Sequence, residues 1–141
     1  MMISQTTEYA LRAVVWMARK PDEQQGTKKI SDAIQVPRGY LSKVLQKLTH
    51  AGLVTSCPGR TGGFRLARDP ADIRVLEVVN AVDPLQRIQS CPLGLESHGS
   101  KLCALHQKLD DDLARTERAF ATTTITDLLA DKKGSPPLCE T

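Results

Sequence analysis

Two cysteines and two histidines fall within sixteen residues of this chain, a density that suits metal binding. They are Cys91, His98, Cys103 and His106, and the chain has only three histidines in all. Cys103 and His106 lie three residues apart and would share one face of a helix start. The other two lie on a loop that can fold toward them. Because thiolate and imidazole bind zinc and iron, the spacing predicts a site for a metal ion or an iron–sulfur cluster.

Two other interpretations of this Cys/His loop compete with the metal site. Cys91 and Cys103 could form a reversible disulfide that acts as a redox switch. Alternatively, the cysteines are small buried apolar residues and the loop carries no cofactor. The segment has no Cys-x-x-Cys pair, and its spacing matches no closed zinc template. The metal or cluster is the favoured interpretation, and Cys57 and Cys139 are expected to play no part.

A second kind of chemistry is concentrated in residues 27–68, which carry eight Lys or Arg against one Asp. The whole chain has a formal net charge of +3, so the rest of it sums to −4. Proteins bind nucleic-acid phosphates by gathering cations on one surface. The alternative is a solvated basic face, and charge alone does not separate the two. The local architecture has to decide.

The first part of this basic segment predicts two helices joined by a short turn. Thr27 is a candidate N-cap for a helix with apolar residues at helical spacing. These residues are Ile30, Ala33 and Ile34. Pro37 then starts a second helix, over about residues 38–51, because its missing amide would have no helical partner there. Gly52 is the candidate residue just after the helix end.

The second helix has the partition expected of a helix that reads the major groove of DNA. One stripe is apolar and would pack on its own domain; it consists of Leu41, Val44, Leu45 and Leu48. The other side offers groups that donate to phosphates or base edges. The candidate DNA contacts on these two helices are Lys28, Arg38, Tyr40, Ser42, Lys43, Gln46 and Lys47.

A β-hairpin is predicted to follow directly. Residues 54–57 and 63–66 have the composition of strands, and turn-forming residues separate them. Glycine lets the backbone approach a phosphate closely, and Arg60 at the tip could enter the minor groove. The candidate contacts are Arg60, Thr61, Gly62 and Arg65. A helix-turn-helix followed by a hairpin is a winged helix, which favours DNA binding over a helical domain that binds another protein.

Flanking helices complete the predicted architecture. A first helix, capped by Ser4, covers about residues 5–19, and another ends near Asp83 with an apolar stripe of Leu76, Val79 and Val82. From His106 a longer amphipathic helix follows. Its apolar stripe consists of Leu102, Leu105, Leu109, Leu113, Thr116 and Phe120. We expect this face to pack on a second copy and form a homodimer that binds paired half-sites, unless the helix folds back on its own domain.

The predicted fold is mainly α with a small β-hairpin: a winged helix-turn-helix plus a long C-terminal dimerisation helix. Four segments are expected along the chain. They are a DNA-binding domain over residues 1–83, a Cys/His sensor loop over 84–104, a dimerisation helix with a short last helix over 105–131, and a disordered tail over 132–141.

Composition narrows the function further. A chain of 141 residues that is 40% hydrophobic can bury one core with an extension. Only 4% is aromatic, which leaves few stacking platforms and favours duplex DNA over single strands or RNA. No signal peptide or membrane-spanning run is recognisable, so the protein is expected to be cytoplasmic. No nucleophile–base pair or phosphate-binding loop is recognisable either, so it is not expected to be an enzyme.

Three motifs carry a resemblance to a known family: the opening Ile3–Ala13, the helix end within Tyr40–Val54, and Gly62–Ala67. Together they resemble the Rrf-two family of bacterial transcription regulators, over about residues 1–130. The resemblance implies a homodimeric winged-helix DNA-binding protein. Several members of that family carry an iron–sulfur cluster in the loop before the dimerisation helix.

The resemblance also implies ligand positions. Cluster-bearing members typically show three cysteines in that loop. Cys91 and Cys103 match the first and the last, whereas the middle position falls near His98. His106 matches a histidine ligand of the family, and Glu8 lies where some members draw an acidic ligand from the partner subunit.

The wing departs from the family pattern in one place. The family often has Arg just before the first wing glycine, where this chain has Pro58, so Arg60 is expected to supply that groove contact. The sequence thus predicts a homodimeric repressor that binds a palindromic operator in double-stranded DNA and responds to the metal, iron–sulfur or redox state of its Cys/His loop. The alternatives are a protein-interaction module, or a cofactor-free regulator controlled by a partner or a small molecule.

Overall fold

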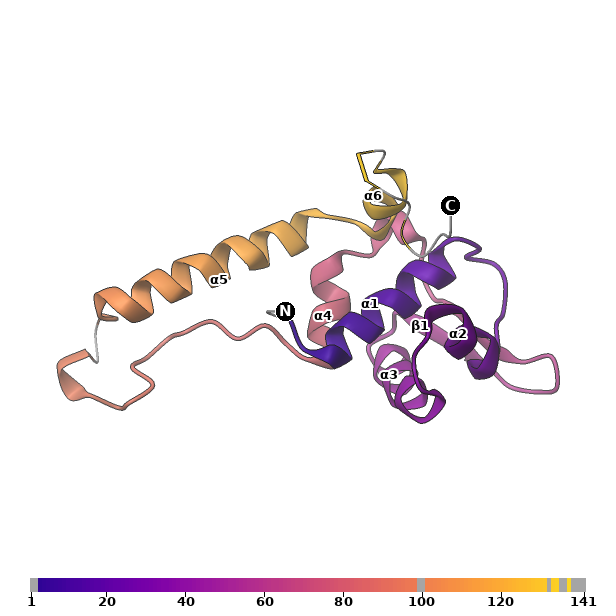
Figure 1. Ribbon diagram of the computed structural model, residues 1–141, viewed down its shortest axis with the longest axis horizontal. Helices are drawn as coiled ribbons and strands as arrows, with labels where there is room; N and C mark the ends of the chain where they lie inside the picture. The colour runs from indigo at the N-terminus through magenta and orange to yellow at the C-terminus, as the bar shows by residue number, and fades with distance from the viewer. Residues whose placement is uncertain (1–2, 99–100, 132, 135–136, 138–141) are drawn as a thin grey trace.

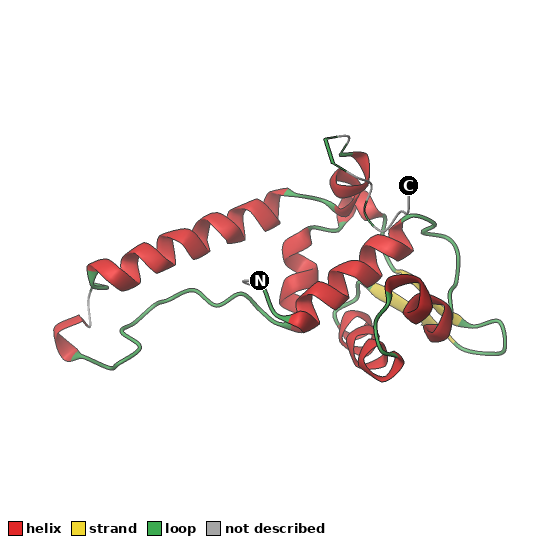
Figure 2. Ribbon diagram, viewed as in Figure 1, coloured by secondary structure: helices red, strands yellow, loops and turns green. Residues whose placement is uncertain are grey.

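The computed structural model describes residues 3–98, 101–131, 133–134 and 137, so most of the tail predicted to be disordered lies outside the described residues. Helices dominate, with one β-hairpin (Figure 2), which confirms the predicted fold class. In chain order the elements are α1 (Gln5–Ala18), α2 (Thr27–Ile34), α3 (Arg38–His50), β1 (Val54–Cys57), β2 (Gly63–Leu66), the 3-10 turn η1 (Pro70–Asp72), α4 (Val75–Val82), the 3-10 turn η2 (Glu96–His98), α5 (Ala104–Thr122) and α6 (Ile125–Ala130).

One hydrophobic core holds α1 to α4 together (Figure 1). Met17 of α1, Leu45 of α3 and Ile73 before α4 are essentially fully buried, and removing such apolar surface from water is the main favourable term in folding. Ser4 caps α1 as predicted, because its Oγ accepts a hydrogen bond from the Thr7 amide at 3.1 Å. The predicted apolar stripe of α3 is buried, and this fixes which side of α3 faces solvent.

The start of α2 differs from the prediction. Gly26, and not Thr27, is the N-cap residue, and Thr27 is the first helical residue. The reason lies one residue earlier: Gln25 forms a β-bridge with Phe64 of β2, so the chain turns into the helix directly after Gly26.

The buried faces of α2 and α4 also differ from the predicted ones. Ala33 is exposed, because Ile30 and Ile34 already face the core from positions one turn apart. In α4, Leu76 is only half-buried, and the core face consists of Val75, Val78, Val79 and Val82.

The wing is a tight antiparallel hairpin in which Val54 pairs with Leu66 and Cys57 with Gly63. Its two adjacent glycines have a packing reason that the sequence analysis did not consider. A Cβ at Gly62 would overlap the carbonyl oxygen of Cys57, and one at Gly63 would overlap the backbone of Gln25. Gln25 exchanges two backbone hydrogen bonds with Phe64, of 3.0 and 2.8 Å, which joins the wing to the segment before α2.

Residues 83–122, the arm, extend away from the winged helix. Figure 1 shows the loop after α4 running outward and α5 returning beside it to the body of the molecule. The long helix begins at Ala104, two residues before the predicted start.

The end of the arm is attached at the start of α4, the end of that helix opposite to the one from which the arm leaves. The Val75 amide donates to the Thr123 carbonyl at 2.9 Å, and the Ile125 amide donates to the Ile73 carbonyl at 2.9 Å. Thr124 caps α6, the predicted short last helix, which starts at Ile125. Ile125 is fully buried in the core, so α6 packs with the winged helix.

In the part of the chain that the structure describes, no helix combines the length and the apolar character needed to cross a bilayer.

Candidate DNA-binding surface and Cys/His loop

The solvent-facing side of α3 carries most of the predicted DNA contacts. Arg38, Lys43 and Gln46 are exposed, because the opposite stripe of the helix is in the core. Ser42 is half-buried, and its hydroxyl donates to the Arg38 carbonyl at 3.1 Å, one turn earlier. The hydroxyl oxygen keeps its acceptor sites, so Ser42 can still accept a hydrogen bond from outside.

Tyr40 is held in place by a second aromatic ring. It is 46% exposed at the start of α3, and its ring meets that of Tyr9 edge to face, with 5.6 Å between centroids. The Arg12 guanidinium lies 5.5 Å from the centroid of Tyr9. Such aromatic pairs add about 0.5–1.5 kcal/mol to the burial of their surface. The phenol of Tyr40 is therefore presented to solvent from a supported ring.

Lys47 has a different position from the other predicted contacts. Its Nζ lies 3.4 Å from the carbonyl oxygen of Val82, the last residue of α4. A cation is favourable at a helix C-terminus, where carbonyl groups lack helical partners. Lys47 is exposed, but its ammonium group therefore has a partner within the protein, at the end of α4.

The wing presents the second group of predicted contacts. Arg60 and Thr61 are exposed in the loop between the strands, and Arg65 is exposed on β2. Gly62 is half-buried, and its amide donates to the Gly59 carbonyl at 3.1 Å, which closes the turn. The tip of the hairpin thus carries a cation on a backbone that is fixed by its own hydrogen bonds.

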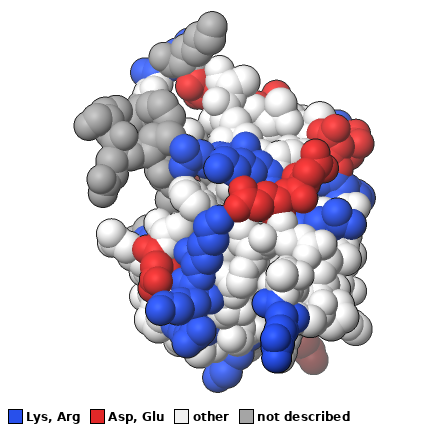
Figure 3. Space-filling view, turned by 90° about the vertical axis from the view of Figure 1, so that its right-hand side faces the viewer, with Lys and Arg blue, Asp and Glu red and all other residues white. Residues whose placement is uncertain are grey.

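Five exposed cations from α2, α3 and the wing form what we call the basic surface: Lys28, Arg38, Lys43, Arg60 and Arg65. Within the described residues, none of the five has a carboxylate within ion-pair distance, whereas Lys29 pairs with Glu23 and Arg68 with Glu77. Figure 3 looks at the end of the molecule that carries the wing and shows Lys and Arg side chains gathered mainly on its lower part, below an acidic strip. Charges without internal partners are available to an external polyanion.

The Cys/His loop brings two of its predicted ligands together. Cys103 is the N-cap residue of α5, and its Sγ lies 3.3 Å from Nδ1 of His106. Cys91 is buried at the other end of the loop. His98 ends η2, and its side chain lies outside the described part of the chain.

The ligands that the structure describes do not form a complete metal site. Among the described residues, no three Cys, His, Asp or Glu side chains come close enough to share a metal ion. Glu8, the predicted acidic ligand, lies on α1, where its carboxylate is 2.7 Å from Nε of Arg12. The Cys103–His106 pair would supply two ligands to a metal or cluster, and both a structural zinc site and a cluster need more.

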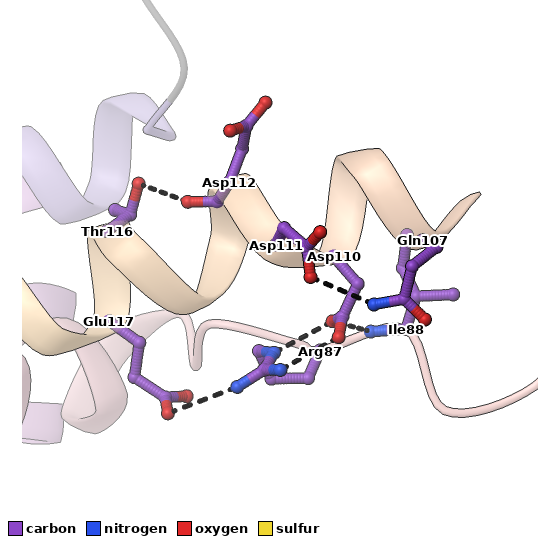
Figure 4. Close-up of polar contacts among 8 residues, drawn as sticks. All are labelled: Arg87, Ile88, Gln107, Asp110, Asp111, Asp112, Thr116 and Glu117. Carbon is purple, nitrogen blue, oxygen red and sulfur yellow. Dashed lines mark hydrogen bonds and ion pairs between the residues drawn. The ribbon is translucent and has the colours of Figure 1, made fainter. Parts of the chain in front are cut away.

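A buried carboxylate ties the loop to α5 (Figure 4). Arg87 donates two hydrogen bonds to Asp110, from Nε at 2.7 Å and from a terminal nitrogen at 2.8 Å, and the Ile88 amide adds a third at 2.9 Å. The hydrogen bonds from Arg87 and then from Ile88 lower the pKa of Asp110 from 3.8 to about 2. Glu117, two turns further along α5, lies 3.7 Å from the same guanidinium.

The predicted apolar stripe of α5 is largely uncovered in the single chain. Leu105 is 62% exposed and Leu109 is 46% exposed, whereas Leu113 and Phe120 are half-buried. An isolated monomer rarely leaves such a row of large apolar side chains in water.

Sequence reasoning missed the role of Arg87 and Asp110. Asp110 stands in a run of three Asp residues, and composition does not distinguish it from its neighbours. One signal was present, because Asp110 and Glu117 are seven residues apart and so lie on the same side of a helix. The position of Lys47 against α4 had no comparable signal in the sequence.

Comparison with known proteins adds a family assignment for this architecture. A sequence model of the Rrf2 family, described as an iron-dependent transcriptional regulator, matches residues 3–131. A protein of Aquifex aeolicus (strain VF5), named as an HTH-type transcriptional regulator, is 29% identical over 132 residues, which are 92% of each chain. These relatives are regulators and not enzymes, as expected from the sequence.

Solved structures share the fold. CymR (YrzC), the global cysteine regulator of B. subtilis, aligns with a TM-score of 0.76 at 22% identity and covers 91% of this chain and 95% of its own. IscR of T. potens aligns with a TM-score of 0.73 at 21% identity and covers 94% of this chain and 89% of its own.

Proposed function

Because the chain belongs to the Rrf2 family of transcriptional regulators, we propose that its basic surface binds duplex DNA, with α3 in the major groove and the wing in the adjacent minor groove. The predicted contact residues Lys28, Arg38, Tyr40, Ser42, Lys43, Gln46, Arg60, Thr61, Gly62 and Arg65 form this interface. Lys47 supports α3 through Val82 and contributes less to DNA binding.

One observation carries this proposal. Five cations from three successive elements lack carboxylate partners among the described residues, although other Lys and Arg side chains of the same segment are paired. Cations that lack internal partners give up no ion pair when they meet phosphates, so their attraction to DNA is retained in full.

We further propose that the protein binds DNA as a homodimer joined through the exposed apolar stripe of α5. Leu105 and Leu109 are the most exposed members of that stripe, and a second copy would remove them from water. A two-fold dimer presents two α3 helices, so the operator is a palindrome with half-sites about one helical turn, or 34 Å, apart. A dimer seated across a promoter excludes other proteins from it, which makes repression the expected outcome.

The signal is proposed to act at the Cys/His loop. Arg87 and Ile88, in the first part of the loop, hold Asp110 of α5, and the residue after α5 is hydrogen-bonded to the start of α4. A rearrangement of the loop would therefore pull on α5 and change the spacing of the two α3 helices. That rearrangement could follow from a metal or iron–sulfur group, which would need ligands beyond Cys103 and His106, or from a Cys91–Cys103 disulfide.

The DNA-binding proposal is tested by a salt series. Five phosphate contacts predict that the logarithm of the affinity for duplex DNA falls with the logarithm of salt concentration with a slope of about −4.5 per protomer. Arg60→Ala is expected to reduce that slope by about 0.9, whereas Arg118→Ala, an exposed substitution on α5, leaves it unchanged. An affinity that does not depend on salt would exclude this interface and favour a protein-interaction module.

The proposed signal is tested separately, by anaerobic purification of the wild type and of Cys91→Ala. Iron with visible absorption bands, lost in the variant, would identify a cluster, and zinc without colour would identify a zinc site. If the protein holds neither, operator affinity is compared between reduced and oxidised protein. Equal operator affinity in the metal-loaded, metal-free and oxidised states would contradict the sensor role of the loop.

A further inference from the structure

A small pocket between α1 and α2 takes no part in the functions proposed above. Its volume is about 240 Å³. The residues that line it are Trp16, Arg19, Lys20, Glu23, Gln25 and Lys29. It lies at the C-terminal end of α1, away from the arm (Figure 1).

Gln25, one of the residues that line the pocket, is buried, and its side-chain NH₂ group has no hydrogen-bond acceptor in the described part of the chain. Gln25 is only 3% exposed, and its Oε1 accepts a hydrogen bond from Nε1 of Trp16 at 2.8 Å. An indole nitrogen can only donate, so the carboxamide oxygen must face Trp16 and the NH₂ group must face the other way. Within the described residues, Nε2 of Gln25 has no acceptor at hydrogen-bond distance. Buried donors are nearly always paired in folded proteins, and this one lines a cavity.

The backbone of Gln25 is also held in place. Its own amide and carbonyl are both bonded to Phe64 of β2, at 3.0 and 2.8 Å. The side chain is thus fixed at both ends, by β2 and by Trp16. The NH₂ group is left as a preorganised donor for a ligand in the pocket.

The charges around the pocket favour an anion. Three of its six lining residues are cations and one is an acid, so the lining carries a net charge of +2. Glu23 pairs with Lys29 at 2.6 Å and with Lys20 at 3.7 Å. The Arg19 guanidinium lies 5.0 Å from the ring centroid of Trp16. Positive charge and an aromatic surface therefore occur side by side.

We propose that this pocket binds a small organic anion, a carboxylate carried on an aromatic or otherwise apolar body. One carboxylate oxygen accepts the hydrogen bond from Nε2 of Gln25, and the negative charge faces Arg19 and the lysines. The apolar body contacts the indole of Trp16. Inorganic phosphate and the phosphates of DNA offer similar acceptors, and the experiment separates them from a carboxylate.

The chain contains a single tryptophan, so its fluorescence reports directly on this pocket. The probe is benzoate, compared with benzamide, which has the same shape and no charge, and with inorganic phosphate. We expect a saturable change of the fluorescence with benzoate and none with benzamide at equal concentrations. A dissociation constant of about 1–10 mM is appropriate for a ligand of this size. The measurement uses the full chain without DNA, so it does not depend on the proposed function.

Two variants test the role of the amide and of the charge. Gln25→Glu keeps an oxygen for Trp16, replaces the NH₂ donor with a second oxygen, and is expected to weaken benzoate binding by about tenfold or more. Arg19→Gln, at the rim, is expected to weaken it about threefold and serves if the buried substitution prevents folding. Arg118→Gln, on the distant α5, is the matched control and leaves benzoate binding unchanged.

Several results would overturn the proposal. The first is a fluorescence that shows no saturable change with benzoate, and the second is equal binding of benzamide and benzoate. The third is benzoate binding of wild-type strength in a folded Gln25→Glu protein or, where that variant does not fold, in Arg19→Gln. Tighter binding of phosphate than of benzoate, lost in the same variants, would also overturn it and assign the pocket to phosphate.

Discussion

Asp110 is a buried carboxylate on a helix whose other residues are exposed or half-buried. Three hydrogen bonds from Arg87 and Ile88 compensate its burial, so it is stable only as long as it is ionised. The same contacts make Asp110 the link between the first part of the Cys/His loop and α5 (Figure 4). Removing the charge tests both the stability and the link.

Asp110→Asn is expected to destabilise the protein at neutral pH. The pKa of Asp110 is lowered from 3.8 to about 2, first by the hydrogen bonds from Arg87 and next by that from Ile88. A lowered pKa means that the ionised carboxylate stabilises the fold above pH 4, and that this contribution is lost as the pH falls from about 4 to about 2. The gap in urea midpoint between the wild type and Asp110→Asn should therefore narrow over that range.

The matched control is Asp111→Asn, which changes an exposed neighbour on the same helix. Its urea midpoint should stay close to that of the wild type at every pH. A gap between Asp110→Asn and the wild type that stays constant from pH 7 to pH 3 would contradict the role given to the charge.

Two glycines give opposite predictions for the same substitution. Gly63→Ala would place a Cβ against the backbone of Gln25 and is expected to lower the free energy of unfolding by about 1–3 kcal/mol. Gly39→Ala has open space in the first turn of α3 and is expected to raise it by up to about 0.5 kcal/mol, because alanine loses less backbone freedom than glycine on folding into a helix. Urea denaturation measures both changes, and a destabilising Gly39→Ala or a neutral Gly63→Ala would contradict the packing described here.

At the scale of elements, α3 has one side packed in the core and another available for contacts outside the core. Its apolar stripe fixes its orientation in the core, and its polar residues divide between solvent and α4. Lys43 and Lys47 are one turn apart and chemically identical, yet the first faces solvent and the second binds the Val82 carbonyl. The two lysines therefore form a natural pair for comparison.

Lys43→Ala is expected to weaken DNA binding and to reduce the salt slope by about 0.9, because it removes one phosphate contact. Lys47→Ala should leave the slope unchanged and instead lower the free energy of unfolding by about 0.3–1 kcal/mol, through the lost interaction at the end of α4. A salt titration of DNA affinity combined with urea denaturation separates the two effects. Equal slopes for the two variants would show that Lys47 also contacts DNA.

The elements of the winged helix could be predicted from the sequence because their signals are local. The stripe Leu41, Val44, Leu45 and Leu48 repeats at helical spacing, and glycine and proline mark the ends of α3 and the turn of the wing. Both strands were predicted with their observed bounds. The basic charge of the segment could be read from composition alone.

The rest depends on contacts between residues far apart in the chain. The partner of Gln25 is Phe64, and that of Lys47 is Val82, 35 residues away. Arg87 reaches Asp110 across 23 residues. No local pattern encodes such a pair, and for this reason the sequence predicted the candidate contacts on α3 but not that Lys47 would bind the end of α4.

At the scale of the whole molecule, α5 is the element that the single chain does not bury. Figure 1 shows α5 running away from the other helices. Leu105 and Leu109 of its apolar stripe are exposed, whereas Phe120, near the end of α5, packs against the core of the winged helix. A second copy would cover the exposed leucines, and the proposed palindromic operator depends on that contact.

Leu109→Glu is expected to separate the homodimer into monomers, because it places a charge in the middle of the apolar stripe. Sedimentation velocity should show the mass of one chain, and DNA affinity should fall, since a monomer contacts one half-site only. Arg118→Glu, about two and a half turns further along and on the opposite side of α5, is the control and should leave the mass unchanged. A dimer that persists in Leu109→Glu would place the interface elsewhere.

The arm is attached to the winged helix at two points, one at each end of α4, a helix of eight residues that is about 12 Å long. The chain leaves the body at one end of this helix and returns at the other, where Thr123 and Ile125 rejoin the segment of Ile73 and Val75. An arm attached in this way can lengthen, shorten or change its side chains in the course of evolution while the hydrogen bonds at its attachment points stay the same. The same winged helix can therefore be combined with arms of different chemistry, and the ligands in the arm of a relative need not be preserved in the arm of this protein.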